Sequence, residues 1–204
     1  FLIELDKLIY LKKIIFAGSC SEYEIKKNKK NELSEENFKL SKSHFSIAKD
    51  KVNSIYTNYC KKNKISFIWL RIFFIYGKYQ RKNSIIPFII DNLNKKRTTF
   101  LNEPNKSVDF IHISDLILLL FSILKYKKYL IGNFNCGSGK SYKILEIYNL
   151  ISRELVSNIK YDTDLNNNDY TTMYANVQKT AKYFKWYPKL SIKAGIKKVL
   201  DEKN

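Results

Sequence analysis

The chain has 204 residues, 45% of them apolar, which is enough for one large domain or two small ones and excludes a chain disordered by composition. It carries 37 Lys and Arg against 19 Asp and Glu, a formal net charge of +18, and 33 of the basic residues are lysine. Because specific nucleic-acid recognition depends on the planar guanidinium group of arginine, we interpret this charge as a solvated surface and do not expect a nucleic-acid partner.

Apolar runs of strand length alternate along the chain with segments of helical periodicity. We expect strands at 14–17, 65–70, 98–101, 108–113, 132–136 and 159–161, and helices at 2–11, 43–63, 85–93, 115–126, 141–157, 177–184 and 192–200. The polar segment 26–37, rich in Lys, Asn and Glu, is expected to be a loop. Strands that alternate with helices predict an α/β fold with a parallel sheet.

Few residues in the sequence are of the types that bind metals or form disulfides. Cys20, Cys60 and Cys136 lie far apart without a C-x-x-C pair, and His44 and His112 are the only histidines. We therefore expect neither a disulfide framework nor a metal site. Apolar runs fall short of the roughly 18 residues of a membrane-spanning helix, and the first residues do not have the pattern of a signal peptide. A cytoplasmic protein without a membrane partner is expected.

One short motif resembles a phosphate-binding loop. Residues 137–141 (GSGKS) end like the P-loop pattern, which needs a further glycine five residues before Gly139 so that backbone amides can surround the phosphate. That position is Phe134. We therefore interpret the motif as a glycine-rich turn that leads into a capped helix.

A second series of segments is more specific. In chain order, the series consists of GSCSEY (18–23), FSIAK (45–49), RIFFIYG (71–77), DFIHISD (109–115), FNCGSGKS (134–141) and KWYP (185–188). In this order and spacing, the segments resemble the extended short-chain dehydrogenase/reductase family, the NAD(P)-dependent nucleotide-sugar epimerases, dehydratases and reductases. The resemblance covers nearly the whole chain. It implies a Rossmann-like sheet that binds NAD or NADP at the carboxyl ends of its strands, and a small C-terminal subdomain that binds a nucleotide-sugar.

The resemblance also assigns roles to residues near the first strand. In the family, a Ser or Thr at the end of this strand hydrogen-bonds the sugar oxygen at the carbon that gains or loses hydride, and Ser19 holds that position. A Tyr four residues before a Lys transfers the proton, while the Lys lowers the tyrosine pKa and binds the nicotinamide ribose. Lys49 holds the lysine position, as a catalytic and cofactor-binding residue. Phe45 replaces the expected Tyr and cannot transfer a proton, and Tyr23 is an alternative proton carrier.

The part of the family pattern that binds the cofactor pyrophosphate is missing. No Gly-x-x-Gly-x-x-Gly turn occurs in the sequence. The strand at 14–17 corresponds to the family's fourth strand, so we expect roughly the first three strands and two helices to be absent. Residues 1–77 are then a partial Rossmann-like cofactor domain with the catalytic half. Residues 78–204 are mainly the nucleotide-sugar-binding subdomain, with some segments that return to the sheet.

The substrate side of the family pattern is better preserved. The segment from Asn83 to Pro87 resembles the one that leads the nucleotide-sugar into the C-terminal subdomain, and Gln80, Arg81 and Asn83 are the candidate substrate-binding residues. Two positions depart from the pattern. Phe74 stands where many members have a sugar-binding Asn, and Val108 stands where many have a phosphate-binding Arg.

Three polar residues of the DFIHISD segment have a structural interpretation. We expect Asp109, His112 and Asp115 to orient a loop and cap the following helix rather than to carry chemistry.

Three hypotheses follow for the function. The chain is a truncated or degenerate member of the enzyme family that is inactive alone, one half of a split enzyme completed by an N-terminal partner chain, or a non-catalytic basic binding module. A homodimer is a further possible assembly. Absent strands would leave the strand at 14–17 or its neighbour at an open sheet edge.

Overall fold

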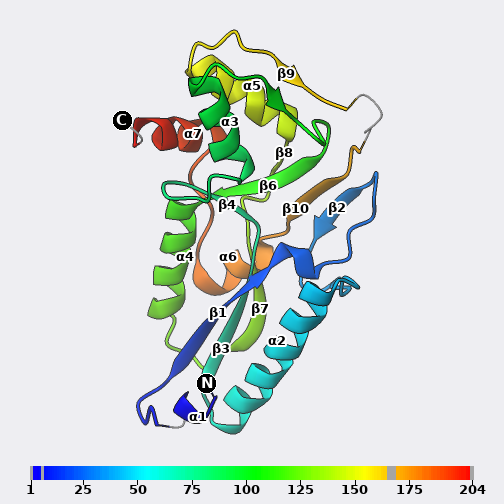
Figure 1. Cartoon of the computed structure of the whole chain (residues 1–204). Helices are drawn as coiled ribbons and strands as arrows, with labels where there is room; N and C mark the ends of the chain where they lie inside the picture. The colour runs from blue at the N-terminus through cyan, green and yellow to red at the C-terminus, as the bar shows by residue number, and fades with distance from the viewer. Residues whose placement is uncertain (1, 6, 165–168, 203–204) are drawn as a thin grey trace.

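The computed structural model describes residues 2–5, 7–164 and 169–202 and contains a three-stranded parallel sheet in the order β1-β3-β7 (Figure 1). Its strands are β1 (Lys13–Ser19), β3 (Ser66–Ile72) and β7 (Ile131–Cys136). Every residue of the central strand β3 except the last is buried, as its near-continuous apolar sequence requires. The predicted α/β class with a Rossmann-like parallel sheet is confirmed, and β1 lies at one edge.

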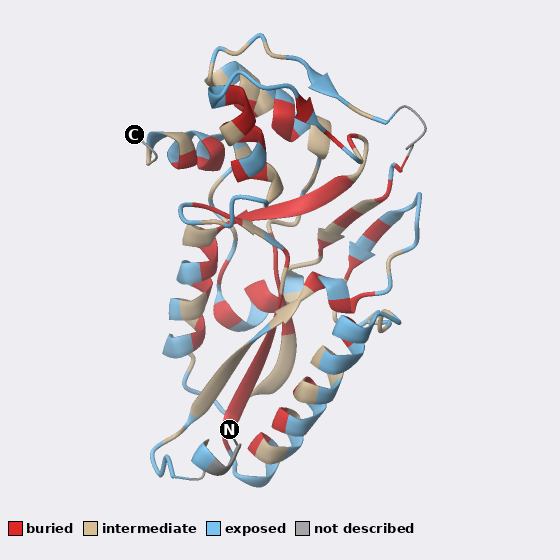
Figure 2. Ribbon diagram, viewed as in Figure 1, coloured by how far each residue is buried: buried red, intermediate tan, exposed pale blue. Residues whose placement is uncertain are grey.

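Helices cover both faces of this sheet (Figure 2). On one face lies α2 (His44–Lys62), which begins where the Ser43 side chain accepts a hydrogen bond from the Ser46 amide, and whose Tyr56 and Cys60 pack into the sheet. On the other face lie α4 (Ile113–Lys125) and α6 (Gln178–Phe184), which share an apolar core with the sheet. The sheet is therefore the middle layer of three.

A second sheet has the order β2-β10-β6-β4, and β8 pairs antiparallel with β6. These strands are β2 (Lys30–Leu33), β4 (Phe74–Tyr76), β6 (Ser107–His112), β8 (Ser141–Lys143) and β10 (Thr172–Ala175). The upper part of the molecule in Figure 1 also contains α3 (Ile85–Asn94), α5 (Ile144–Glu154), α7 (Ile192–Asp201) and the strand pair β5 (Thr99–Phe100) and β9 (Tyr161–Asp162). An apolar core separate from that of the first sheet holds these elements together.

The structure corrects several expected elements. The helix expected at 2–11 is only α1 (Leu2–Leu5), and the exposed side chains of Leu8, Ile9 and Tyr10 add no buried contacts that would support a longer helix. The expected loop 26–37 contains β2, and the helix expected at 141–157 begins only after β8. The strands β4 and β10 were not expected.

Both halves of the chain contribute to both sheets. The late strand β7 completes the first sheet, whereas the early strand β2 joins the second. The domain boundary itself stays a prediction.

Candidate active site

Ser19 ends β1 and starts the short helical turn η1 (Cys20–Glu22). Its hydroxyl oxygen accepts a hydrogen bond from the Ser21 amide at 3.1 Å, and its own amide donates to Glu22 Oε1 at 2.7 Å. These two bonds form a capping box that fixes the serine at the carboxyl end of a parallel strand. Open α/β sheets bind their ligands at this end.

Lys49 lies one helical turn after Phe45 on α2, beside the end of β1. Its Nζ donates a hydrogen bond to the Ala17 carbonyl oxygen at 2.8 Å. The same nitrogen lies 5.7 to 5.8 Å from the ring centroids of Phe16, Phe45 and Trp69. Phe45 is 52% exposed. The structure therefore brings Lys49 and Phe45 together on α2. Lys49 contacts β1 at Ala17, two residues before Ser19.

A buried ion pair beneath this site was not predicted from the sequence. Glu22 and Arg71 are each 1% exposed at their side chains, and Arg71 Nε donates to Glu22 Oε2 at 2.9 Å. Trp69 Nε1 also donates to the Glu22 carboxylate at 3.1 Å. The guanidinium carbon lies 3.7 Å from the Phe38 ring centroid and 5.0 Å from that of Tyr23. The sequence signal that could have found this pair was an acidic residue just after the first strand, in GSCSEY, and a basic residue at the end of the next apolar run, in RIFFIYG.

Tyr23 belongs to the core and not to the open site. It is 3% exposed, and its hydroxyl donates to Asn135 Oδ1 at 2.7 Å. Burial raises the pKa of Tyr23 to about 12, although the neighbouring Arg71 opposes the shift. Because its side chain is buried and its hydroxyl is bonded to Asn135, Tyr23 is not placed to carry a proton at Ser19, and this alternative is wrong.

The glycine-rich turn at 137–139 is held by an internal carboxylate. Asp109 is fully buried and accepts hydrogen bonds from the amides of Ser138, Gly139 and Ala175 at 2.7, 2.9 and 3.0 Å. Burial raises the Asp109 pKa, and these hydrogen bonds oppose the shift. Because Asp109 already occupies the amides, the turn cannot cradle a phosphate. Asp109 therefore orients this turn, as expected, but the turn leads into strand β8 and not directly into a helix.

His112 and Asp115 also have structural roles. His112 Nδ1 accepts from the Ser114 amide and caps α4, while the Asp115 carboxylate accepts from the amides of Lys189 and Leu190. Burial, assisted by the Lys198 ammonium, holds the His112 pKa below its usual value. Both residues position α4 and the segment before α7.

The expected substrate-binding residues divide into two groups. Arg81 and Asn83, with Lys82 and Ser84, line a cavity of about 490 Å³ just before α3. Gln80 does not line this cavity, because its Nε2 donates to the Ile75 carbonyl oxygen at 2.8 Å. The structure thus brings Arg81 and Asn83 together and gives Gln80 a contact with β4.

The two positions that depart from the family pattern carry no polar group. Phe74 is 38% exposed and packs against Phe110 at 6.0 Å between ring centroids, and Val108 is buried.

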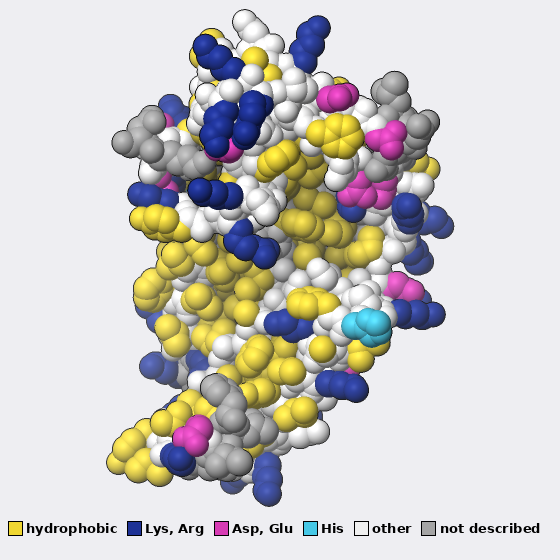
Figure 3. Space-filling view, in the orientation of Figure 1, with side chains coloured by type: hydrophobic (Ala, Val, Ile, Leu, Met, Phe, Trp, Pro, Cys, Tyr) yellow, Lys and Arg dark blue, Asp and Glu magenta, His cyan; other side chains and the backbone are white. Residues whose placement is uncertain are grey.

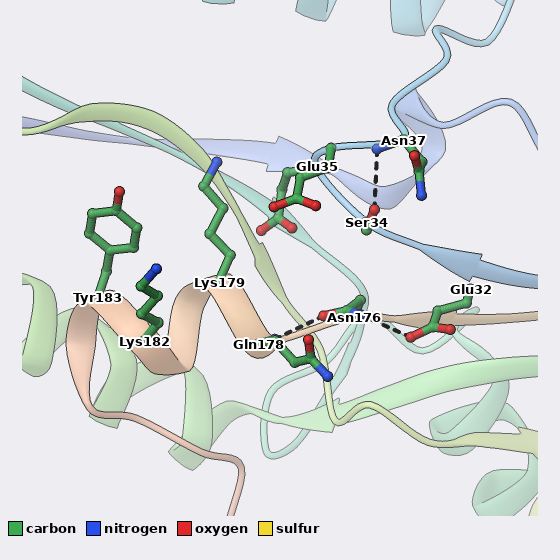
Figure 4. Close-up of a pocket in the computed structure, with 10 residues that line it drawn as sticks. Glu32, Ser34, Glu35, Asn37, Asn176, Gln178, Lys179, Lys182 and Tyr183 are labelled. Carbon is green, nitrogen blue, oxygen red and sulfur yellow. Dashed lines mark hydrogen bonds between the residues drawn. The ribbon is translucent and has the colours of Figure 1, made fainter.

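A second cavity of about 440 Å³ lies between the segment after β2 and α6 (Figure 4). Its lining includes Glu35, Lys179, Lys182 and Tyr183, and Figure 4 shows the lysines and the tyrosine projecting from the same helix. Glu35 is not free in this cavity, because its Oε1 accepts from the Asn135 amide at 2.6 Å. This contact gives the Asn135 amide of β7 a side-chain acceptor.

Among the described residues, no group of three or more His, Cys, Asp or Glu side chains is placed to hold a metal ion. No helix in ranges 2–5, 7–164 and 169–202 is both long and apolar enough to cross a membrane.

Curated relatives match much of this chain but only about half of their own length. A CDP-abequose synthase from Salmonella typhimurium (strain LT2) is 28% identical over 172 residues, which is 79% of this chain and 54% of that protein. A CDP-abequose synthase from Salmonella muenchen is 26% identical over 144 residues, 68% of this chain and 48% of that protein.

Solved structures share the fold. The UDP-glucuronic acid 4-epimerase of Bacillus cereus, in complex with UDP-glucuronic acid and NAD, superposes with a TM-score of 0.84 at 23% identity, over 98% of this chain and 63% of the other. The dTDP-glucose 4,6-dehydratase of Bacillus anthracis, in complex with NAD, has a TM-score of 0.82 at 22% identity, over 100% of this chain and 65% of the other. The family model described as the NAD dependent epimerase/dehydratase family matches residues 2–137. The chain therefore belongs to the NAD-dependent epimerase/dehydratase family.

Proposed function

We propose that this chain supplies the reaction centre and the nucleotide-sugar site of an NAD(P)-dependent oxidoreductase of nucleotide-sugars, and that it is catalytically impaired without further polypeptide. The observation that carries this proposal is the placement of Ser19 and Lys49 together at the carboxyl end of β1, beside the open edge of the sheet. The family membership and the nucleotide-sugar complexes of the structural neighbours support it.

The fit of the chain to NAD(P) is partial. Lys49 presents an ammonium group suited to the hydroxyls of the nicotinamide ribose, and Ser19 presents a hydroxyl suited to the reacting sugar oxygen. For the pyrophosphate there is no matching cradle in the described residues, because the amides of the one Gly-x-Gly turn are bonded to Asp109. When bound, the cofactor would accept or donate hydride. A tight complex needs a pyrophosphate site from elsewhere.

Phe45 sets the second limit on activity. Hydride transfer at a sugar carbinol or ketone requires a proton to leave or reach the oxygen, and the phenyl ring of Phe45 has no group to carry it. General acid–base catalysis contributes about 10²- to 10⁴-fold to a rate. One structural neighbour is a tyrosine-to-phenylalanine mutant of UDP-glucuronic acid 4-epimerase in complex with a fluorinated UDP-sugar and NAD. That complex is consistent with ligand binding by a chain that has Phe at this position.

The cavity before α3 is the proposed site for the sugar-linked diphosphate. Arg81 and Lys82 supply positive charge there, and the Ser84 hydroxyl makes no capping bond within α3 and is available to a ligand. Anions are favoured at a helix N-terminus because its first amides have no partner inside the helix. A nucleoside diphosphate-sugar matches this combination of charge and donors.

Calorimetric titration of the chain with CDP-glucose and with UDP-glucose tests this site. A charge-assisted hydrogen bond contributes about 1.5–3 kcal/mol, so Arg81→Ala should weaken binding of either ligand by about tenfold or more. Arg153→Ala, which removes an exposed arginine near the end of α5, is the matched control and should leave the affinity unchanged. Equal losses in the two variants, or no binding of either ligand by the unmodified chain, would contradict the proposed site.

A further inference from the structure

We propose that the cavity between the segment after β2 and α6 binds a small organic zwitterion, with an ammonium group and a carboxylate at opposite ends of a short carbon chain. This cavity shares no lining residue with the cavity before α3, so the inference goes beyond the proposed function. Its volume of about 440 Å³ is in the usual range of small-molecule sites. Every lining side chain carries a polar or charged group, so the cavity fits a polar ligand.

Charges of opposite sign line the two walls of the cavity. Three carboxylates, those of Glu32, Glu35 and Glu36, lie on the wall formed by β2 and the segment after it. Two ammonium groups, those of Lys179 and Lys182, lie on the α6 wall, and Figure 4 shows both lysines projecting from that helix. In the described part of the chain no ion pair joins the two walls. A ligand with one charge of each sign complements this arrangement.

The composition of the chain does not account for this group of carboxylates. The chain has 37 Lys and Arg but only 19 Asp and Glu, and three of those 19 acidic residues lie in this one cavity. The basic residues are dispersed, since Figure 3 shows Lys and Arg side chains scattered over the face in view without a single continuous patch. The mixed charge of the cavity is therefore a local feature of the fold.

Both walls are held in place by one fully buried residue, Asn135 of β7. Its backbone amide donates to Glu35 Oε1 at 2.6 Å, and its side-chain amide donates to the Leu33 carbonyl oxygen at 2.8 Å. On the other wall, the Thr180 hydroxyl donates to the Asn135 carbonyl oxygen at 2.7 Å. The cavity is therefore formed before a ligand arrives, and binding does not have to order its walls.

The exposed charges of Glu36 and Lys182 are the groups that we expect to bind the two ends of the ligand. Neither side chain has a hydrogen bond or an ion pair with another described residue. The inner charges already have contacts, because Lys179 Nζ lies 5.0 Å from the Phe134 ring centroid and Glu35 is bonded to β7. Burial raises the pKa of Glu35, and hydrogen bonds with backbone amides and the Lys179 ammonium oppose the shift.

The cavity also has an apolar surface for the carbon chain of such a ligand. Tyr183 is 36% exposed, and its ring packs edge-on against Phe134 at 5.4 Å between ring centroids. This packing fixes the ring, so that its exposed part can contact methylene groups.

Ligands with charge of only one sign fit the cavity less well. An anion would approach three carboxylates, and an organic cation would approach two ammonium groups. A metal ion is not favoured either, because no group of His, Cys, Asp or Glu in the described residues is placed to hold one. The zwitterion is the class of ligand that pairs with both walls.

A nuclear magnetic resonance titration of the full chain with three matched probes tests this inference. The probes are 6-aminohexanoate, hexanoate and hexylamine, which have chains of similar length and carry both charges, only the negative charge and only the positive charge. We expect 6-aminohexanoate to shift the amide resonances of residues 34–37 and 176–183 in a saturable way. It should bind about fivefold or more tightly than either other probe, because each of those lacks one ionic contact.

Charge-removing variants locate the site. Lys182→Gln and Glu36→Gln should each weaken the binding of 6-aminohexanoate by about fivefold or more, and both side chains are exposed, so the fold should not change. Lys193→Gln and Glu24→Gln are the matched controls, because they remove exposed charges outside the cavity. Both controls should bind like the unmodified chain.

The opposite outcomes are equally clear. Hexanoate or hexylamine that binds as tightly as 6-aminohexanoate would assign the cavity to an ion of one sign and overturn the inference. Absence of a saturable shift, or losses in the controls equal to those in the cavity variants, would also overturn it. CDP-glucose binding by Lys182→Gln should equal that of the unmodified chain, so failure of this inference is distinguishable from failure of the proposed function.

Discussion

Removal of the buried Glu22 carboxylate is expected to destabilise the protein strongly. Glu22→Ala would leave the Arg71 guanidinium buried without its ion-pair partner, and would deprive Trp69 Nε1 and the Ser19 amide of their acceptor. Arg71 Nη1 already has no hydrogen-bond partner among the described residues. Breaking a buried pair by removing one partner costs about 3–5 kcal/mol. For a chain of this length that cost lowers the melting temperature by about 6–20 °C.

Urea unfolding followed by tryptophan fluorescence measures this loss. Arg71→Met removes the buried charge that Glu22→Ala leaves without a partner. The double variant Glu22→Ala/Arg71→Met should therefore lose less stability than the sum of the two single losses. Lys95→Ala is the matched control, because the Lys95–Asp91 pair is about half exposed and contributes no more than about 1 kcal/mol. A loss for Glu22→Ala no larger than that of Lys95→Ala would refute the argument that this pair is a stability determinant beneath the site.

Three further outcomes are expected. Burial keeps the pKa of His112 in the folded state below its unfolded value, so the stability that neutral His112 contributes is complete above about pH 6.5 and is lost as the pH falls. His112→Asn keeps an acceptor for the helix cap but does not titrate. In urea unfolding, this variant should lose less stability than the unmodified chain between about pH 7.5 and about pH 5. Gly195→Ala would place a Cβ on the Tyr76 hydroxyl and should cost about 1–3 kcal/mol, a loss that Tyr76→Phe should partly relieve in thermal melts. Phe45→Tyr should give no turnover of NADH with nucleotide-sugars by the chain alone, and measurable turnover would contradict the proposal that residues 1–204 do not hold the whole cofactor.

The strands of the first sheet could be predicted from the sequence because each contains a short run of apolar or small residues of strand length between helical segments. β3 is the clearest case, since its run of large apolar residues has no amphipathic alternative. β2 was missed because it is a short polar strand in which only Asn31 and Leu33 are buried. β2 pairs with β10, whose residues lie about 140 positions later in the chain, and the sequence pattern around β2 does not indicate this pairing.

In the candidate active site, contacts within one helix could be predicted from the sequence, whereas contacts between distant segments could not. Lys49 and Phe45 share one helix face, so their spacing alone predicted that they lie together. The pairing of Glu22 with Arg71 joins the η1 turn after β1 to strand β3. The register that places Gly18 opposite Arg71 in the folded sheet brings the two groups together. Tyr23 was a plausible proton carrier by position along the chain, but tertiary packing turned it into the core.

We propose that Ser19, Lys49 and the cavity before α3 belong to the reaction centre of a nucleotide-sugar oxidoreductase whose cofactor pyrophosphate is bound outside these residues. Fluorescence titration of the isolated chain with NADH tests this proposal. We expect no saturable binding below about 1 mM, a concentration that corresponds to a binding free energy of only about 4 kcal/mol. Saturable binding with a micromolar dissociation constant would contradict the proposal, because residues 1–204 would then hold the whole cofactor.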